Sequence, residues 1–135
     1  MTPRTRFLCS LIGFYFVLVA LCMLARREAT VEIVEALIHN APLMLMAGMI
    51  AVAAGLALVI SHNIWSGGAA TIIVTLVGWA ALAKGLLILL LPPNAAVEFF
   101  LETMRFAEFF YFYMGATLVI GIFLAYRGVR GPSPA

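Results

Sequence analysis

Charged side chains are scarce in this sequence: they make up 10% of its 135 residues, whereas hydrophobic residues make up 65%. A soluble domain carries about 25% charged and about 45–50% apolar residues. The mean hydropathy is +1.14. A water-soluble fold of this length could not bury so much apolar surface, so we expect most of the chain to lie in lipid. The net charge of +2, without a basic aromatic surface, argues against nucleic acid as a partner.

Motifs for catalysis and nucleotide binding are absent. The sequence contains no Walker loop, GxGxxG, HExxH, GxSxG or paired CxxC, and no acid and base at a spacing that suggests paired catalysis. We therefore predict no enzymatic activity, no cofactor and no metal. Of the two cysteines, Cys9 and Cys22 lie on one expected helix, about 20 Å apart, too far for a disulfide.

Four apolar runs are long enough to cross a bilayer, which takes about 20 residues per helix. They are Phe7–Ala25, Pro42–Ile60, Ala69–Leu91 and Phe106–Tyr126. Backbone groups in lipid must be satisfied within the segment, which favours helices, and no alternating strands of a barrel occur. The first run lacks a small-x-small cleavage site, so we expect a retained helix and not a signal peptide. We predict an all-α polytopic membrane protein, with residues 1–135 forming one four-helix transmembrane domain.

An internal repeat is indicated by matches at an offset of 65 to 66 residues. Ser10–Phe14 matches Thr75–Trp79, Val31–Val34 matches Val97–Phe100, and the order of parts also recurs. The predicted units are residues 7–65 and 69–130. Each unit crosses the membrane twice, so the two units are expected to be parallel, related by a pseudo-twofold axis along the membrane normal.

A stripe of polar residues joins the first two apolar runs. Glu28, Glu32, Glu35 and His39 follow the spacing i, i+4, i+7, i+11, which places them on one face of a helix. We predict an amphipathic helix on the outer membrane surface. The alternative is a cation or proton site, because Glu32, Glu35 and His39 could reach one metal. In the second unit the matching stripe is Glu98, Glu102 and Arg105.

Ionisable residues near or within the spans are the further candidates for function. Lys84 lies inside the third run, and an intramembrane charge indicates a functional site with a partner. The alternative is a lysine that snorkels to the surface. We expect Glu108 to pair with it, with Glu98 as second choice. His62, in the loop Ser61–Gly68, is a further candidate for a proton-linked or partner-contacting group.

Orientation follows from the arginines. One side carries Arg4, Arg6, Arg127 and Arg130 without any acid, and the other carries three arginines and all six glutamates. The positive-inside rule then predicts a multi-pass protein of the inner (plasma) membrane with both termini in the cytoplasm.

Small residues four apart occur on three of the runs and allow close helix packing. They are Ala47, Ala51 and Gly55, then Ala81 and Gly85, then Gly121 and Ala125. We predict a non-catalytic, oligomerising accessory or scaffold module, with the lipid bilayer and a homo-oligomer or larger membrane-protein complex as partners. The alternative is an ion or small-solute channel or transporter that uses Lys84 and the outer glutamates.

Overall fold

Four long apolar helices dominate the structure, a computed structural model that describes residues 2–103, 105 and 108–130. These helices are α1 (Pro3–Ala25), α3 (Ala41–Ser61), α4 (Ala69–Leu90) and α6 (Phe110–Arg130). Each has 21 to 23 residues and is apolar enough to cross a membrane. Throughout the described ranges the elements are helices, with no strand. The prediction of an all-α chain with four membrane-spanning helices is confirmed.

Local signals set most helix ends. The Thr2 side chain accepts a hydrogen bond from Thr5 N at 3.2 Å, and the Asn40 side chain accepts one from Leu43 N at 3.2 Å. Both residues precede a helix with proline in its first turn, where a missing N–H does no harm. Gly67 and Gly68 have φ angles of +99° and +117°, which glycine adopts at no steric cost.

The fourth span begins later than predicted. Its helix runs from Phe110 to Arg130 in place of Phe106–Tyr126. The chain before it contains a short helix, α5 (Pro93–Val97), then a π-helical turn, η1 (Glu98–Thr103), and Arg105 has a φ of +47°. The aromatic residues that follow Arg105 in the sequence have the same hydropathy in a helix as outside one. Hydropathy therefore could not locate the start of the fourth helix.

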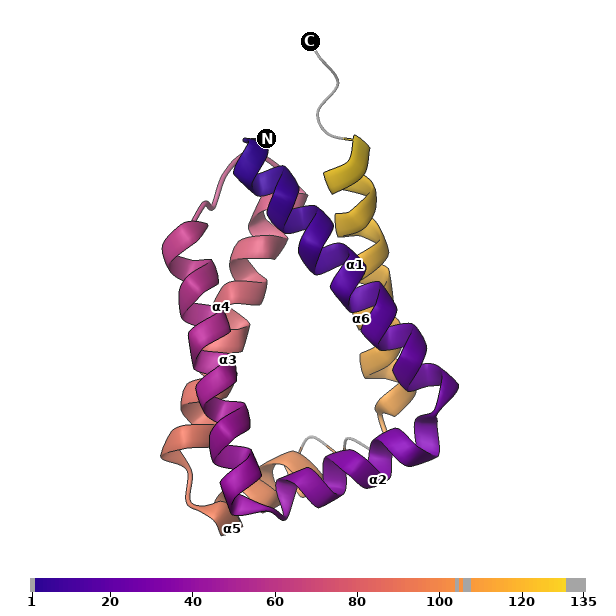
Figure 1. Cartoon of the computed structure of the whole chain (residues 1–135), viewed down its shortest axis with the longest axis vertical. Helices are drawn as coiled ribbons and strands as arrows, with labels where there is room; N and C mark the ends of the chain where they lie inside the picture. The colour runs from indigo at the N-terminus through magenta and orange to yellow at the C-terminus, as the bar shows by residue number, and fades with distance from the viewer. Residues whose placement is uncertain (1, 104, 106–107, 131–135) are drawn as a thin grey trace.

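The four spans associate as two antiparallel pairs, α1 with α6 and α3 with α4 (Figure 1). Glycines bring the backbones together in both. A Cβ on Gly121 would lie 2.9 Å from Phe16 Cβ, and a Cβ on Gly85 would lie 2.6 Å from Val52 N. A Cβ on Gly13 or Gly55 would overlap the backbone of the partner helix. The small-residue seams predicted from the sequence are therefore used inside the chain.

The two pairs meet at one end and diverge toward the other, so the molecule has a triangular outline (Figure 1). We call the joined end the apex; it contains the start of α1, residues 62–68 and the end of α6. The wide end is the base, where α2 (Arg27–Ile38) runs from one pair to the other and α5 lies beside α3 and α4. Arg4 Nη1 donates to Ser61 O across the apex at 3.4 Å.

Two apolar clusters hold this arrangement. The apex cluster has Cys9, Ile12, Ala70, Val74 and Leu124 as its buried members, so it joins α1, α4 and α6. The base cluster has Ile38, Met44 and Ala96, which come from α2, α3 and α5. The apex cluster thus fixes the two pairs to each other, and the base cluster fixes the connecting segments to one pair.

Candidate functional site

Lys84 is an exposed cation inside the span formed by α4. It follows Ile73 and Val77 at i+11 and i+7, which places all three residues on one face of the helix. Ile73 and Val77 pack against the apex cluster, toward α1 and α6. Lys84 therefore lies on the face of α4 that is directed at the other helix pair, at a level where that pair no longer covers it.

The expected partner of Lys84 is engaged elsewhere. The Glu108 carboxylate lies 3.5 Å from Arg105 Nη1, and both side chains are more than half exposed. An exposed pair of this kind contributes about 0–1 kcal/mol to stability. Within the described part of the chain, Lys84 forms no ion pair with Glu108 or with Glu98.

The glutamate stripe lies at the base, as part of an exposed surface. Glu28, Glu32 and Glu35 are exposed on α2, and Glu98 and Glu102 are exposed on η1. His39 is also exposed, and its Nδ1 lies 2.8 Å from the backbone oxygen of Glu35, where a protonated nitrogen donates. Among the described residues, no three His, Cys, Asp or Glu side chains gather as metal ligands.

His62 is buried at the apex, with 1% of its surface exposed. Its Nε2 lies 3.4 Å from the Thr71 carbonyl oxygen, and its Nδ1 has no hydrogen-bond partner among the described atoms. The imidazole thus forms part of the packing between the loop and α4.

Thr75 holds the same loop through its hydroxyl group. The hydroxyl donates to Ile64 O at 2.7 Å and accepts from Ile64 N at 3.2 Å. Asn63 Oδ1 accepts from the indole nitrogens of Trp65 and Trp79, at 2.9 and 3.3 Å. The sequence interpretation had singled out His62 and missed Thr75. Its position four residues after Thr71 and four before Trp79, on one helix face, is the signal that could have found it.

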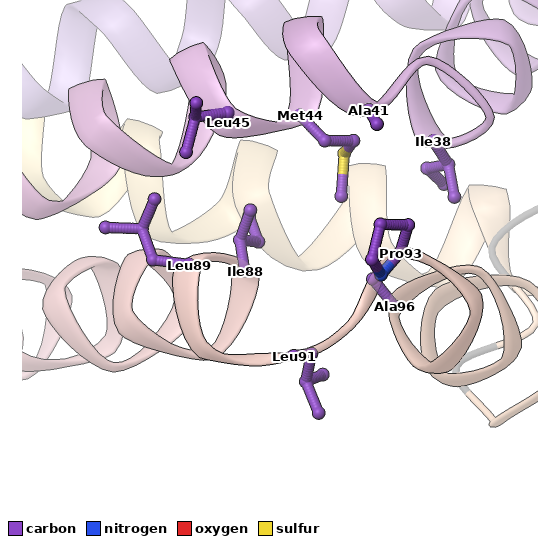
Figure 2. A pocket seen from close by; sticks show the side chains of 9 residues that line it. All are labelled: Ile38, Ala41, Met44, Leu45, Ile88, Leu89, Leu91, Pro93 and Ala96. Atoms are coloured by element: carbon purple, nitrogen blue, oxygen red, sulfur yellow. The ribbon is translucent and has the colours of Figure 1, made fainter.

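A small apolar pocket lies near the base between α2, α3, α4 and α5, with a volume of about 200 Å³ (Figure 2). Figure 2 shows only apolar side chains around it, including Met44, Ile88 and Leu89. Ile88 is one helical turn beyond Lys84. The wall between Lys84 and the end of α4 is therefore hydrocarbon, and it offers the ammonium group no acceptor.

The fold and these sites define the class as a multi-pass membrane protein with four candidate spans. Comparison with protein-family models, curated proteins and solved structures finds no match to this chain.

Proposed function

We propose that this chain is a non-catalytic module of the inner (plasma) membrane that acts by assembling, either as a homo-oligomer or within a larger membrane-protein complex. The observation that supports this proposal is where its buried polar groups lie. Thr5, His62, Thr71 and Thr75 are the buried polar side chains among the described residues, and all four are at the apex. Below the apex, the buried side chains of the described residues are apolar, and the outer surfaces are left for interaction.

The small residues that allow close helix packing are used within one chain, so assembly needs other surfaces. The glycine seams pair α1 with α6 and α3 with α4 within one chain. Only 17–28% of the most apolar stretch of each span is buried. Assembly therefore uses the remaining faces of the spans, which carry large apolar side chains such as Leu18, Ile50 and Val119.

Native mass spectrometry after extraction in mild detergent tests this proposal, together with chemical cross-linking in intact membranes. We expect a complex larger than one chain in both experiments. A single chain without a protein partner in both experiments would contradict assembly as its function.

The proposed orientation has the apex in the cytoplasm and the base outside. Arg4, Arg6, Arg127 and Arg130 all belong to the apex end, which carries no acid among the described residues. The six glutamates belong to the base end. This distribution supports the positive-inside assignment.

Two parallel repeats form part of the same proposal. The apex cluster contains three pairs at an offset of 65, which are Leu8 with Ile73, Cys9 with Val74, and Ile12 with Val77. The helix seams correspond in the same way, because Gly121 faces Phe16 while Gly55, 66 residues earlier, faces Leu82. A pseudo-twofold axis along the membrane normal would exchange α1 with α4 and α3 with α6, and would relate these contacts.

A conduit for ions or small solutes is the second candidate, favoured by Lys84. It is a cation within a span, directed at the other helix pair and without an ion pair among the described residues. The base glutamates would gather cations near it. Flux into proteoliposomes, compared between the wild type, Lys84→Ala and Glu108→Gln, tests this function. No flux of cations, anions or protons by the wild type would exclude it.

A further inference from the structure

Lys84 sits where the two helix pairs have separated. Ile73 and Val77, on the same face of α4, contact the apex cluster, whereas Lys84 is exposed. The change from partly buried Val77 to exposed Lys84 marks the level at which α1 and α6 stop contacting this face of α4. From Val77 to the end of α4 at Leu90, the inward face of the helix extends for about 20 Å.

That length fits one leaflet of a bilayer. The hydrocarbon core is about 30 Å thick, so one leaflet contributes about 15 Å. The apex cluster joins the two pairs at the apex, and their helices diverge toward the base (Figure 1). A spanning helix needs the full thickness and is blocked by this cluster, whereas a lipid of the base-side leaflet needs only the open half.

The charge of Lys84 selects the kind of lipid. An ammonium group in hydrocarbon is costly without an anion. It lies about 9 Å from the base end of α4, and its flexible stem extends toward that boundary. The next turn offers Ile88, at the apolar pocket of Figure 2. A second copy of the chain supplies no carboxylate at this depth, because all six glutamates lie outside the spans.

We propose that Lys84 binds the phosphate of one anionic phospholipid from the base-side leaflet, whose acyl chains fill the space between the two helix pairs as far as the apex cluster. The phosphate accepts charge-assisted hydrogen bonds from the ammonium group. The acyl chains contact the apolar inward faces of both pairs. The lipid then acts as a structural component that keeps the two pairs at their spacing.

The internal offset of 65 provides a design for the test. Val19 follows Leu8 and Ile12 at i+11 and i+7, as Lys84 follows Ile73 and Val77. Leu8 and Ile12 also belong to the apex cluster. Position 19 is therefore the position on α1 that faces the same space, and a lysine placed there would present its charge to the same lipid.

The protein is reconstituted with an equal mixture of phosphatidylglycerol and phosphatidylcholine with identical acyl chains, and the lipid retained after detergent extraction is counted by native mass spectrometry. The wild type and Lys84→Arg should retain one phosphatidylglycerol. Lys84→Met should reduce its retention on the order of tenfold, the loss expected for one charge-assisted contact. Arg26→Gln, which removes an exposed cation at the base, should leave retention unchanged.

The double variant Lys84→Met/Val19→Lys should regain the phosphatidylglycerol, which a purely structural role of Lys84 would not produce. Equal retention of the two lipids by the wild type would overturn the proposal. So would unchanged retention by Lys84→Met. A photo-cross-linker at position 84 that captures a polypeptide and no lipid would also overturn the proposal, because it would show that a protein partner contacts Lys84. The lipid-retention results do not depend on whether the chain assembles with other proteins.

Discussion

A few polar residues at the apex contribute the hydrogen bonds that hold its loop. Thr75 is 1% exposed, and its one hydroxyl group satisfies both the N–H and the C=O of Ile64. Ile64 is 37% exposed, so removing the Thr75 hydroxyl costs chiefly these two hydrogen bonds, each about 0.5–1.5 kcal/mol. The loop between α3 and α4 is therefore held to α4 by one small polar side chain.

Thr75→Val keeps the shape of the side chain and removes these hydrogen bonds. We expect the free energy of unfolding to fall by about 1–3 kcal/mol, measured by thermal or denaturant unfolding in detergent micelles. Thr117→Val is the matched control, because the Thr117 hydroxyl donates only to Tyr113 O, four residues earlier on its own helix. That change should stay within about 0.5 kcal/mol. Equal effects of the two substitutions would show that the loop contacts contribute nothing.

Lys84 illustrates what the sequence can predict at this scale. An isolated charge in a span makes this residue a candidate, because hydropathy alone shows it. Its side of the helix and the lack of a glutamate partner depend on where α1 and α6 diverge, which no local pattern encodes. The sequence predicted that Glu108 lies near Lys84, yet Glu108 pairs with Arg105.

At the scale of the helices, glycine decides how closely two backbones approach. Gly55 faces the backbone of Ala81 and Leu82, and a Cβ there would overlap that backbone. Gly115 lies on α6, and no described atom outside its own helix backbone and chain neighbours lies within 4 Å of the place its Cβ would take. Alanine at these two positions has the same effect on helix propensity, so a difference in stability between the two variants reports helix packing.

Gly55→Ala should push α3 and α4 apart and lower the free energy of unfolding by about 1–3 kcal/mol, as overpacking does. Gly115→Ala should cause no loss and a gain of up to about 1 kcal/mol, because alanine is the better helix former. Unfolding of both variants in the same detergent checks this. A loss at Gly115 as large as the loss at Gly55 would contradict the packing of the α3–α4 pair.

Helix positions were predictable where composition determines them. The spans starting near Pro42 and Ala69 agree with α3 and α4 to within a residue at the start, since asparagine, proline and glycine mark both starts. The start of the fourth span was wrong by four residues, since α6 begins at Phe110, and hydropathy does not reveal the left-handed backbone of Arg105 just before the predicted start. The partners of the small residues were open in the sequence, since the same spacing serves contacts within or between chains.

For the whole molecule, the arrangement places the start of α1, residues 62–68 and the end of α6 at one end, and α2 with η1 at the other (Figure 1). Single cysteines introduced by Ser66→Cys and Glu32→Cys, in a background where Cys9 and Cys22 are alanine, test the orientation in intact cells. A membrane-impermeant maleimide should label position 32 and leave position 66 unlabelled until the membrane is opened. Labelling of both positions from the same side would contradict the topology.

The central claim is that the two helix pairs join at the apex and separate at the base. In the cysteine-free background, spin labels at Phe7 on α1 and Ile60 on α3 report the apex, and labels at Leu21 and Met46 on the same helices report the base. All four side chains are more than half exposed. Pulsed electron paramagnetic resonance in lipid nanodiscs measures both distances. The structure predicts a clearly longer distance between the labels at the base than between the labels at the apex. Equal distances, as in a bundle whose helices run side by side along their whole length, would contradict it.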